Sequence, residues 1–303
     1  MTLTEGHAAV HQAILGDRLR LPLDAHLARR VTGAPLAHPG LVWDVSIGQS
    51  TPLTQRVLAN LFYRGLRFHR APAIGDTLST TTTVAALKQN AMRAGRRATG
   101  LAALHIVTVD DADRRVLDYW RCAMLPLRDP RGQTGRTDDL DVVPTVVDTM
   151  RLGEATASWD LAAMREGCEG PFATDLVPGT AWLGLGGSVV SAAPELARLS
   201  LNIAAAHHDA TGTPTGRRLV YGGHTIGLAA AHVSLALPNI ATIVAWEHCD
   251  HLGPVFEGDT LRSDVTLEAV EGVLVTVHVR VHATREGGEE AEVLDWRLHG
   301  VHP

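Results

Sequence analysis

Residues 72–83 read Pro-Ala-Ile-Gly-Asp-Thr-Leu-Ser-Thr-Thr-Thr-Thr, and residues 254–261 vary the same theme as Pro-Val-Phe-Glu-Gly-Asp-Thr-Leu. The shared Gly-Asp-Thr-Leu cores start at Gly75 and Gly258, an offset of 258 − 75 = 183. A second match, Val-Leu-Asp, starts at Val116 and Val293, an offset of 293 − 116 = 177. An internal repeat of this kind predicts two structural units of one fold, whose loops differ by 183 − 177 = 6 residues.

Each repeat carries the same order of elements. An Ala/Leu-rich segment of helical spacing, as at 5–15, precedes a helix-like apolar stretch, 41–47 in the first repeat and 225–237 in the second. Strand-like alternating runs follow at 77–84 and 101–109, and again at 261–267 and 273–283. One long helix with a run of antiparallel strands predicts an α+β fold, in which the helix lies across a sheet.

The boundaries follow from composition. The polar segment 128–143, rich in Asp, Gly and Arg, is interpreted as a linker between an N-terminal unit, 1–127, and a C-terminal unit, 144–303. The first unit is expected to lack an edge strand, because only the second has a long lead-in, from 172 to 179.

The bulk composition excludes several classes of protein. The net charge of −6 does not favour nucleic-acid binding, which usually requires a basic excess. No apolar run reaches the roughly 20 residues of a membrane span, and the N-terminus lacks the features of a signal peptide. The three cysteines, Cys122, Cys168 and Cys249, lie far apart in sequence and fit a reducing cytosol. We therefore expect a cytoplasmic protein without membrane or nucleic-acid partners.

Two longer stretches carry a family resemblance, Gly-Asp-Thr-Leu-Ser-Thr-Thr at 75–81 and Arg-Arg-Leu-Val-Tyr-Gly-Gly-His at 217–224. They resemble the MaoC-like acyl-thioester hydratases, in particular the fused double-hotdog mesaconyl-CoA hydratases, also called methylmalyl-CoA dehydratases. The resemblance covers nearly the whole chain and implies a tandem double hotdog. Each unit is then a long central helix wrapped by an antiparallel sheet, and the two sheets join. It also implies a substrate carried as a thioester on coenzyme A or an acyl carrier protein, and no cofactor.

In that family, an acid and a histidine within a segment of the type Asp-x-Asn-x-x-His form the hydration dyad. Carried over to this chain, the first unit keeps the acid at Asp17 but has Pro22 at the histidine position. In the second unit, the segment 195–202 is aligned with the dyad, with an acid at Glu195 and Ser200 at the histidine position. On this alignment neither unit has the family histidine.

The start of the second central helix, Tyr-Gly-Gly-His at 221–224, is the predicted centre of the site. N–H groups at a helix N-terminus are unpaired and can bind a thioester oxygen, and glycines allow close approach. The first helix instead has Pro39 at this place, which has no N–H. The predicted catalytic residues are Glu195, His224, Gly223, Gly222, Tyr221 and Asp17, and the predicted substrate-binding residues are Ser200, Asn202, His248, His251, Arg217 and Arg218.

Metal binding is not predicted. The sequence clusters are His207 with His208 and Asp209, and His248 with Asp250 and His251. Zinc sites usually have three or four protein ligands in suitable positions. Adjacent side chains seldom chelate one ion, and alternate spacing puts only His248 and Asp250 on one face of a strand.

Three functions fit these residues. The favoured one is thioester hydrolysis, addition of a nucleophile to the β-carbon of an unsaturated acyl thioester, or both, run by a carboxylate without histidine. The alternative is an enoyl-thioester hydratase or dehydratase of the mesaconyl-CoA hydratase type, in which His224 or His207 replaces the missing histidine. The third is a non-catalytic acyl-thioester binding subunit. Two fused units permit a monomer or a homodimer of fused pairs.

Overall fold

The structure is a computed structural model that describes residues 1–144, 151–211, 213 and 215–303. Its helices are α1 (Glu5–Leu15), α2 (Arg20–Leu23), α3 (Ala25–Thr32), α4 (Pro39–Gln49), α5 (Leu161–Glu166), α6 (Ala193–Leu199) and α7 (Gly222–Ala236). Its strands are β1 (Ala59–Phe68), β2 (Ser79–Gln89), β3 (Thr99–Val109), β4 (Arg115–Pro126), β5 (Ala181–Val189), β6 (Thr242–His251), β7 (Thr260–Glu271), β8 (Leu274–Thr284) and β9 (Glu290–Val301).

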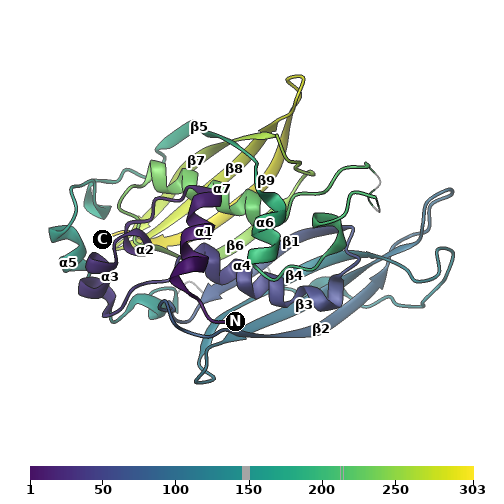
Figure 1. The fold of residues 1–303 in the computed structure, drawn as a ribbon, viewed down its shortest axis with the longest axis horizontal. Helices are drawn as coiled ribbons and strands as arrows, with labels where there is room; N and C mark the ends of the chain where they lie inside the picture. The colour runs from purple at the N-terminus through teal and green to yellow at the C-terminus, as the bar shows by residue number, and fades with distance from the viewer. Residues whose placement is uncertain (145–150, 212, 214) are drawn as a thin grey trace.

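All nine strands form a single antiparallel sheet in the order β2-β3-β4-β1-β6-β9-β8-β7-β5. The first four strands belong to the first repeat and the other five to the second. The repeats join through β1 and β6, where Phe62 lies opposite Asp250 and Arg67 opposite Ala245. Figure 1 shows α1, α4, α6 and α7 on one face of this sheet. The predicted α+β fold with two joined sheets is confirmed.

The Gly-Asp turn explains why the repeat survives in the sequence. Gly75 and Gly258 have φ angles of 107° and 91°, a region that other residues rarely adopt. The following aspartates, Asp76 and Asp259, each accept a hydrogen bond from the backbone amide three residues earlier, at 3.0 and 2.9 Å. The glycine and the aspartate therefore form a compact turn before β2 and β7 in the two units.

The two units differ at their outer edges. In the second unit, Val190 after β5 exchanges backbone hydrogen bonds with the Gly-Asp turn, at 2.9 Å in both directions. In the first unit, Leu3 makes the same pair of bonds to its own Gly-Asp turn, at 2.9 and 2.7 Å. Strand pairing there is reduced to one bridge between Thr2 and Thr77. The expected absence of an edge strand in the first unit is confirmed for the described residues.

The central helices are mostly apolar because they are enclosed on all sides. In α4, every residue from Pro39 to Gly48 is buried, and α7 is buried over most of its length. Trp43 of α4 packs edge-on against Trp246 and Trp296 of the sheet, with ring centroids 4.9 and 6.2 Å apart. The helix start predicted near Pro39 is confirmed, and α7 starts at Gly222, two residues before the predicted His224.

The predicted linker lies along the first unit's sheet. Lys88 of β2 forms a bridge with Thr137, and Val143 packs against Ala86 and Ala103. Beyond it, Leu152 and Met164 pack in one cluster with Leu27 and Val31 of α3, so residues assigned to the second unit cover a helix of the first. The start of that unit at 144 adjoins residues outside the described ones. Within the described part of the chain, no helix is long and apolar enough to cross a membrane.

Candidate active site

The two central helices approach each other at the N-terminus of α7. A Cβ atom placed on Gly223 would lie 2.2 Å from Oδ1 of Asp44 in α4. α1 packs against both helices, and a Cβ on Gly227 of α7 would lie 2.5 Å from a methyl group of Leu15. Glycine is therefore required at both positions for the helices to come this close. The candidate site lies at this junction and contains residues of both units.

A buried carboxylate, Asp44, stands at the centre of the junction. Its Oδ1 accepts a hydrogen bond of 3.0 Å from the hydroxyl of Tyr221, and its Oδ2 accepts one of 3.2 Å from Nε2 of His11. Burial and the neighbouring Asp44 charge raise the pKa of Tyr221 well above its ordinary value, so the hydroxyl stays a donor. Sequence reasoning missed Asp44, although a single acid inside the apolar run 41–47 was the available signal.

The first unit holds a second buried pair, Asp17 and His38. Nε2 of His38 lies 2.9 Å from Oδ1 of Asp17, while its Nδ1 accepts a hydrogen bond from the amide of Gly40. Burial alone would raise the pKa of Asp17, but His38 and a backbone hydrogen bond outweigh it, and the pKa is lowered. With Pro39 lacking an N–H and Gly40 already bonded to His38, the start of α4 offers no ready anion site.

The counterpart of Asp17 in the second unit is Asn202. Asp17 follows Gly16, with φ of 67°, and Asn202 follows Leu201, with φ of 62°. Each side-chain Oδ1 accepts a hydrogen bond from the amide two residues further on, at 2.7 and 2.9 Å. Both side chains are buried. The two segments therefore have one local structure, with an offset of 202 − 17 = 185.

This equivalence corrects the sequence alignment of the second unit. The same offset carries the histidine position from Pro22 to His207, since 207 − 22 = 185. Asn202 and His207 thus take the first and last places of the Asp-x-Asn-x-x-His segment, whereas Glu195 and Ser200 precede it. On this equivalence, His207 stands at the histidine position that the resemblance implies, and Asn202 stands at the position of the acid.

His207 is held in one orientation by the backbone. Its Nδ1 donates a hydrogen bond of 2.8 Å to the carbonyl oxygen of Leu219, so Nδ1 carries the proton and Nε2 has a free lone pair. Burial lowers the pKa of His207 to about 4, which keeps the ring neutral at pH 7. The ring lies against Tyr221, with centroids 5.7 Å apart. A neutral imidazole with a fixed tautomer presents a lone pair on Nε2 that can accept a proton.

The N-terminus of α7 offers free amides beside this histidine. Among the described residues, the N–H groups of Gly222 and Gly223 have no hydrogen-bond partner, and the first bonded amide is that of His224. Unpaired amides at a helix N-terminus carry partial positive charge and favour an anionic oxygen. The ring of His251 packs onto this turn, because a Cβ on Gly222 would lie 2.7 Å from its Nε2.

Several buried polar atoms at the junction are unpaired within the described part of the chain. They are both ring nitrogens of His224, Nε2 of His251 and Oδ2 of Asp17. Burial lowers the pKa of His224 and of His251 to about 4 each, so both rings are neutral at pH 7. Buried polar groups normally have hydrogen-bond partners. Several buried polar atoms without a partner are therefore typical of a site that receives a ligand.

Other predicted residues lie outside this junction. The carboxylate of Glu195 is 51% exposed and pairs with Arg198 at 2.5 Å, so it is not the buried base that was predicted. Ser200 is buried, but its hydroxyl donates to the carbonyl of Ala197. His248 contacts Asp295 of the neighbouring strand β9 instead of lining an acyl cavity with His251.

The predicted substrate-binding arginines lie on the surface before α7. The guanidinium of Arg217 stacks on Phe256 at 4.3 Å, and that of Arg218 pairs with Glu257 at 2.6 Å. Both side chains are exposed. Their role in substrate binding stays a prediction.

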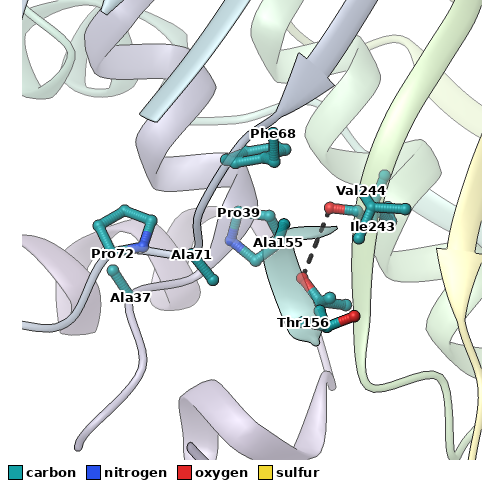
Figure 2. A pocket seen from close by; sticks show the side chains of 10 residues that line it. Ala37, Pro39, Phe68, Ala71, Pro72, Ala155, Thr156, Ile243 and Val244 are labelled. Carbon is teal, nitrogen blue, oxygen red and sulfur yellow. Dashed lines mark hydrogen bonds between the residues drawn. The ribbon is translucent and has the colours of Figure 1, made fainter. Parts of the chain in front are cut away.

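A small cavity lies near the start of α4 (Figure 2). Pro39, Phe68 and Ile243 are among the residues that line it, and its free volume of about 10 Å³ is close to that of one water. Its lining is largely apolar and includes no ionisable side chain. It borders His38 through the flanking Ala37 and Pro39, but it offers no chemistry of its own.

Comparison with known proteins identifies relatives over most of the chain. No family model matches the sequence. The chain is 32% identical over 272 residues to the beta-methylmalyl-CoA dehydratase of Chloroflexus aurantiacus, covering 86% of this chain and 75% of that protein. It is 30% identical over 278 residues to the mesaconyl-CoA hydratase of Cereibacter sphaeroides, covering 86% and 76%.

Solved structures agree with these relatives. A conserved hypothetical protein of Mycobacterium tuberculosis with a double hotdog fold matches with a TM-score of 0.91 and 48% identity, covering 100% of this chain and 93% of that one. A Chloroflexus aurantiacus protein named as a MaoC domain protein dehydratase matches with a TM-score of 0.84 and 28% identity, covering 100% and 92%. The chain therefore belongs to the family of MaoC-like double-hotdog proteins that includes beta-methylmalyl-CoA dehydratase and mesaconyl-CoA hydratase.

Proposed function

We propose that the chain is a hydro-lyase, which adds water reversibly to the double bond of an α,β-unsaturated acyl-CoA. The reaction takes place at the second unit, between His207 and the start of α7. The observation that supports this proposal is the fixed tautomer of His207, whose ring lies 5.7 Å from that of Tyr221, the residue directly before the unpaired amides of Gly222 and Gly223. The named relatives, a hydratase and a dehydratase, support the same reaction class.

This proposal replaces the thioester hydrolysis favoured by the sequence. That preference depended on the absence of the family histidine in both units and on Glu195 as a lone base. When Asn202 is aligned with Asp17, His207 takes the histidine position of the dyad. Glu195 is exposed and paired with Arg198. The hydratase alternative is therefore the better supported of the two.

In the proposed reaction, His207 is the single base, which both removes a proton from water and returns it to the substrate. Nε2 of His207 removes a proton from water, and the oxygen of that water forms a bond to the β-carbon. The electrons of the double bond move towards the thioester oxygen, where negative charge develops. The amides of Gly222 and Gly223 donate hydrogen bonds to this oxygen, assisted by the α7 dipole. The imidazolium of His207 then returns its proton to the α-carbon, and dehydration follows the same steps in reverse.

Asn202 has a structural role in this proposal. An amide cannot act as a base, so the role that an acid shares with histidine in the dyad falls on His207 alone. The Asn202 side chain instead accepts the amide of Ala204 and shapes the segment that leads to His207. Tyr221 ties this segment to the buried Asp44 through its hydroxyl.

The test separates hydration from hydrolysis. The purified chain is incubated with mesaconyl-CoA, a simple straight-chain enoyl-CoA and the matching saturated acyl-CoA. Enoyl absorbance and free thiol are followed together. The mass of the product is measured by mass spectrometry after reaction in ¹⁸O-labelled water. Loss of enoyl absorbance without thiol, with the label in the product, is expected. Thiol release from the saturated acyl-CoA would instead establish hydrolysis and contradict the proposal.

A further inference from the structure

A second cluster of ionisable side chains lies on the opposite face of the sheet from the central helices. His248 of β6, Asp295 of β9 and His278 of β8 come from three neighbouring strands. His248 and His278 are both paired with Arg297 in the register, and Asp295 lies two residues before it. Side chains on directly opposed residues, and on residues two apart, share one face of a sheet. The three side chains therefore converge above β9.

The geometry is that of a metal-ligand set. Oδ1 of Asp295 lies 2.8 Å from Nε2 of His248 and 2.9 Å from Nε2 of His278. All three ligand atoms lie within 4.8 Å of one another. Bonds of about 2.0–2.1 Å to a tetrahedral Zn²⁺ place ligand atoms roughly 3.3 Å apart. We propose that His248, His278 and Asp295 bind one divalent transition-metal ion of the Zn²⁺ class, with water as the remaining ligand.

The surroundings of the three ligands favour a cation. Oε1 of Glu268 lies 3.9 Å from Nδ1 of His278, beyond hydrogen-bond distance, and adds negative charge beside the three ligands. Arg297, which is paired with both histidines in the register, is held by Glu268 at 2.6 Å and by Glu247. Around the cluster lie four carboxylates (Asp295, Asp250, Glu268 and Glu247) and three arginines (Arg297, Arg280 and Arg64). With neutral histidines, the local charge is negative.

The first unit provides a natural control of the same composition. Asp118 is flanked there by His69 and His105, but the two histidines contact different oxygens, Oδ1 and Oδ2. Arg67 donates a hydrogen bond of 2.9 Å to Nδ1 of His69. Since an arginine can only donate, Nδ1 must accept and Nε2 of His69 must carry the proton. Metal binding through Nε2 of His69 would therefore break the Arg67 contact, whereas among the described residues no hydrogen bond to Nδ1 fixes the tautomer of His248 or His278.

The experiment measures metal binding directly and needs no substrate. The untagged full-length chain is stripped with a chelator, desalted and titrated with Zn²⁺ by calorimetry and with Co²⁺ by visible spectroscopy. We expect about one equivalent of either metal, with the intense visible bands of four-coordinate Co²⁺. His278→Ala and Asp295→Asn should each abolish this binding. Glu268→Gln should weaken it without abolishing it, because the change removes one negative charge beside the site.

Two controls make the assignment specific. His105→Ala changes the first-unit group. His282→Ala changes a histidine of β8, the strand that also carries His278; Nε2 of His282 lies 3.5 Å from Asp264 of β7. Metal binding should be unchanged in both of these variants. The absence of a stoichiometric binding event in the wild type would overturn the proposal, as would an event that survives His278→Ala. The Co²⁺ spectrum of the wild type gives this answer even if a variant fails to fold.

Discussion

Replacing His207 with asparagine removes the proposed base while keeping its structural contact. The amide nitrogen of asparagine can donate to the carbonyl of Leu219 as Nδ1 does now, at 2.8 Å. Nothing in asparagine replaces the lone pair of Nε2. Loss of a general base lowers rates by about 10²–10⁴-fold, which is roughly 3–5 kcal/mol of activation free energy. The free energy of unfolding at pH 7.5 should change by only about 1 kcal/mol, because the hydrogen bond persists.

The matched control is His38→Asn in the first unit. Asparagine can still accept the amide of Gly40, as it does at helix N-caps, but the contact of 2.9 Å with Asp17 is lost. Removing the imidazole leaves the buried carboxylate of Asp17 without a hydrogen-bond donor that it has now, which destabilises by about 1–3 kcal/mol. This variant should therefore lose stability and keep most of its kcat at a temperature where it is folded.

The assay measures kcat and KM for enoyl-CoA hydration together with urea unfolding for both variants. The pH profile of the wild type supplies a third measurement. Its acid limb should follow the pKa of His207, about 4 in the free protein, with kcat/KM rising as pH increases through that value. A His207→Asn enzyme with near-normal kcat, combined with a large rate loss in His38→Asn, would show that the first unit holds the working site.

Three further predictions concern the same junction. Gly223→Ala should lower kcat by about 10²–10³-fold, because its Cβ would lie 2.2 Å from Oδ1 of Asp44 and displace the amides of α7; unchanged kinetics would show that these amides are not used. It should also reduce the free energy of unfolding by about 1–3 kcal/mol, as overpacking does. Glu195→Gln should leave kcat within about twofold of wild type, since an exposed ion pair contributes little; a large loss of kcat would restore the carboxylate mechanism. His224→Leu removes a buried imidazole whose ring nitrogens have no partner among the described residues, and it should raise the free energy of unfolding measured in urea. Because burial lowers the pKa of His224 from 6.5 to about 4, the wild type loses stability as pH falls from 6.5 towards 4. The advantage of the variant should therefore grow over that window by up to about 1.4 kcal/mol per pH unit, and a constant difference would contradict it.

Much of the fold could be predicted because it depends on local sequence. The Gly-Asp turns need a glycine at positive φ and an aspartate that accepts a nearby amide, and both requirements are visible in a few consecutive residues. The buried helices α4 and α7 can be recognised in the sequence as short apolar stretches. Equal spacing between helix start and turn, 75 − 38 = 37 and 258 − 221 = 37, then predicts two copies of one unit.

The site was harder to predict because its parts come from distant segments. The segment that holds His207 has an offset of 185 between the units, whereas the helices and turns have 183. An alignment by residue type therefore placed the second dyad at Glu195, an acid that faces solvent. Backbone conformation and the matching hydrogen bonds of Asp17 and Asn202 identify the equivalent residues where side-chain chemistry has diverged.

The sequence alone is enough to predict the repeat, the turn chemistry, the two central helices and the glycines at the start of α7, because each depends on neighbours along the chain. Which polar groups meet becomes visible only in the folded chain. Tyr221 bonds to Asp44 across a separation of 177 residues, and His248 meets Asp295 rather than Asp250, which follows it by two residues. Such pairs depend on helix packing and strand register, and each is held by burial, because an unpaired polar group at these places is costly in free energy.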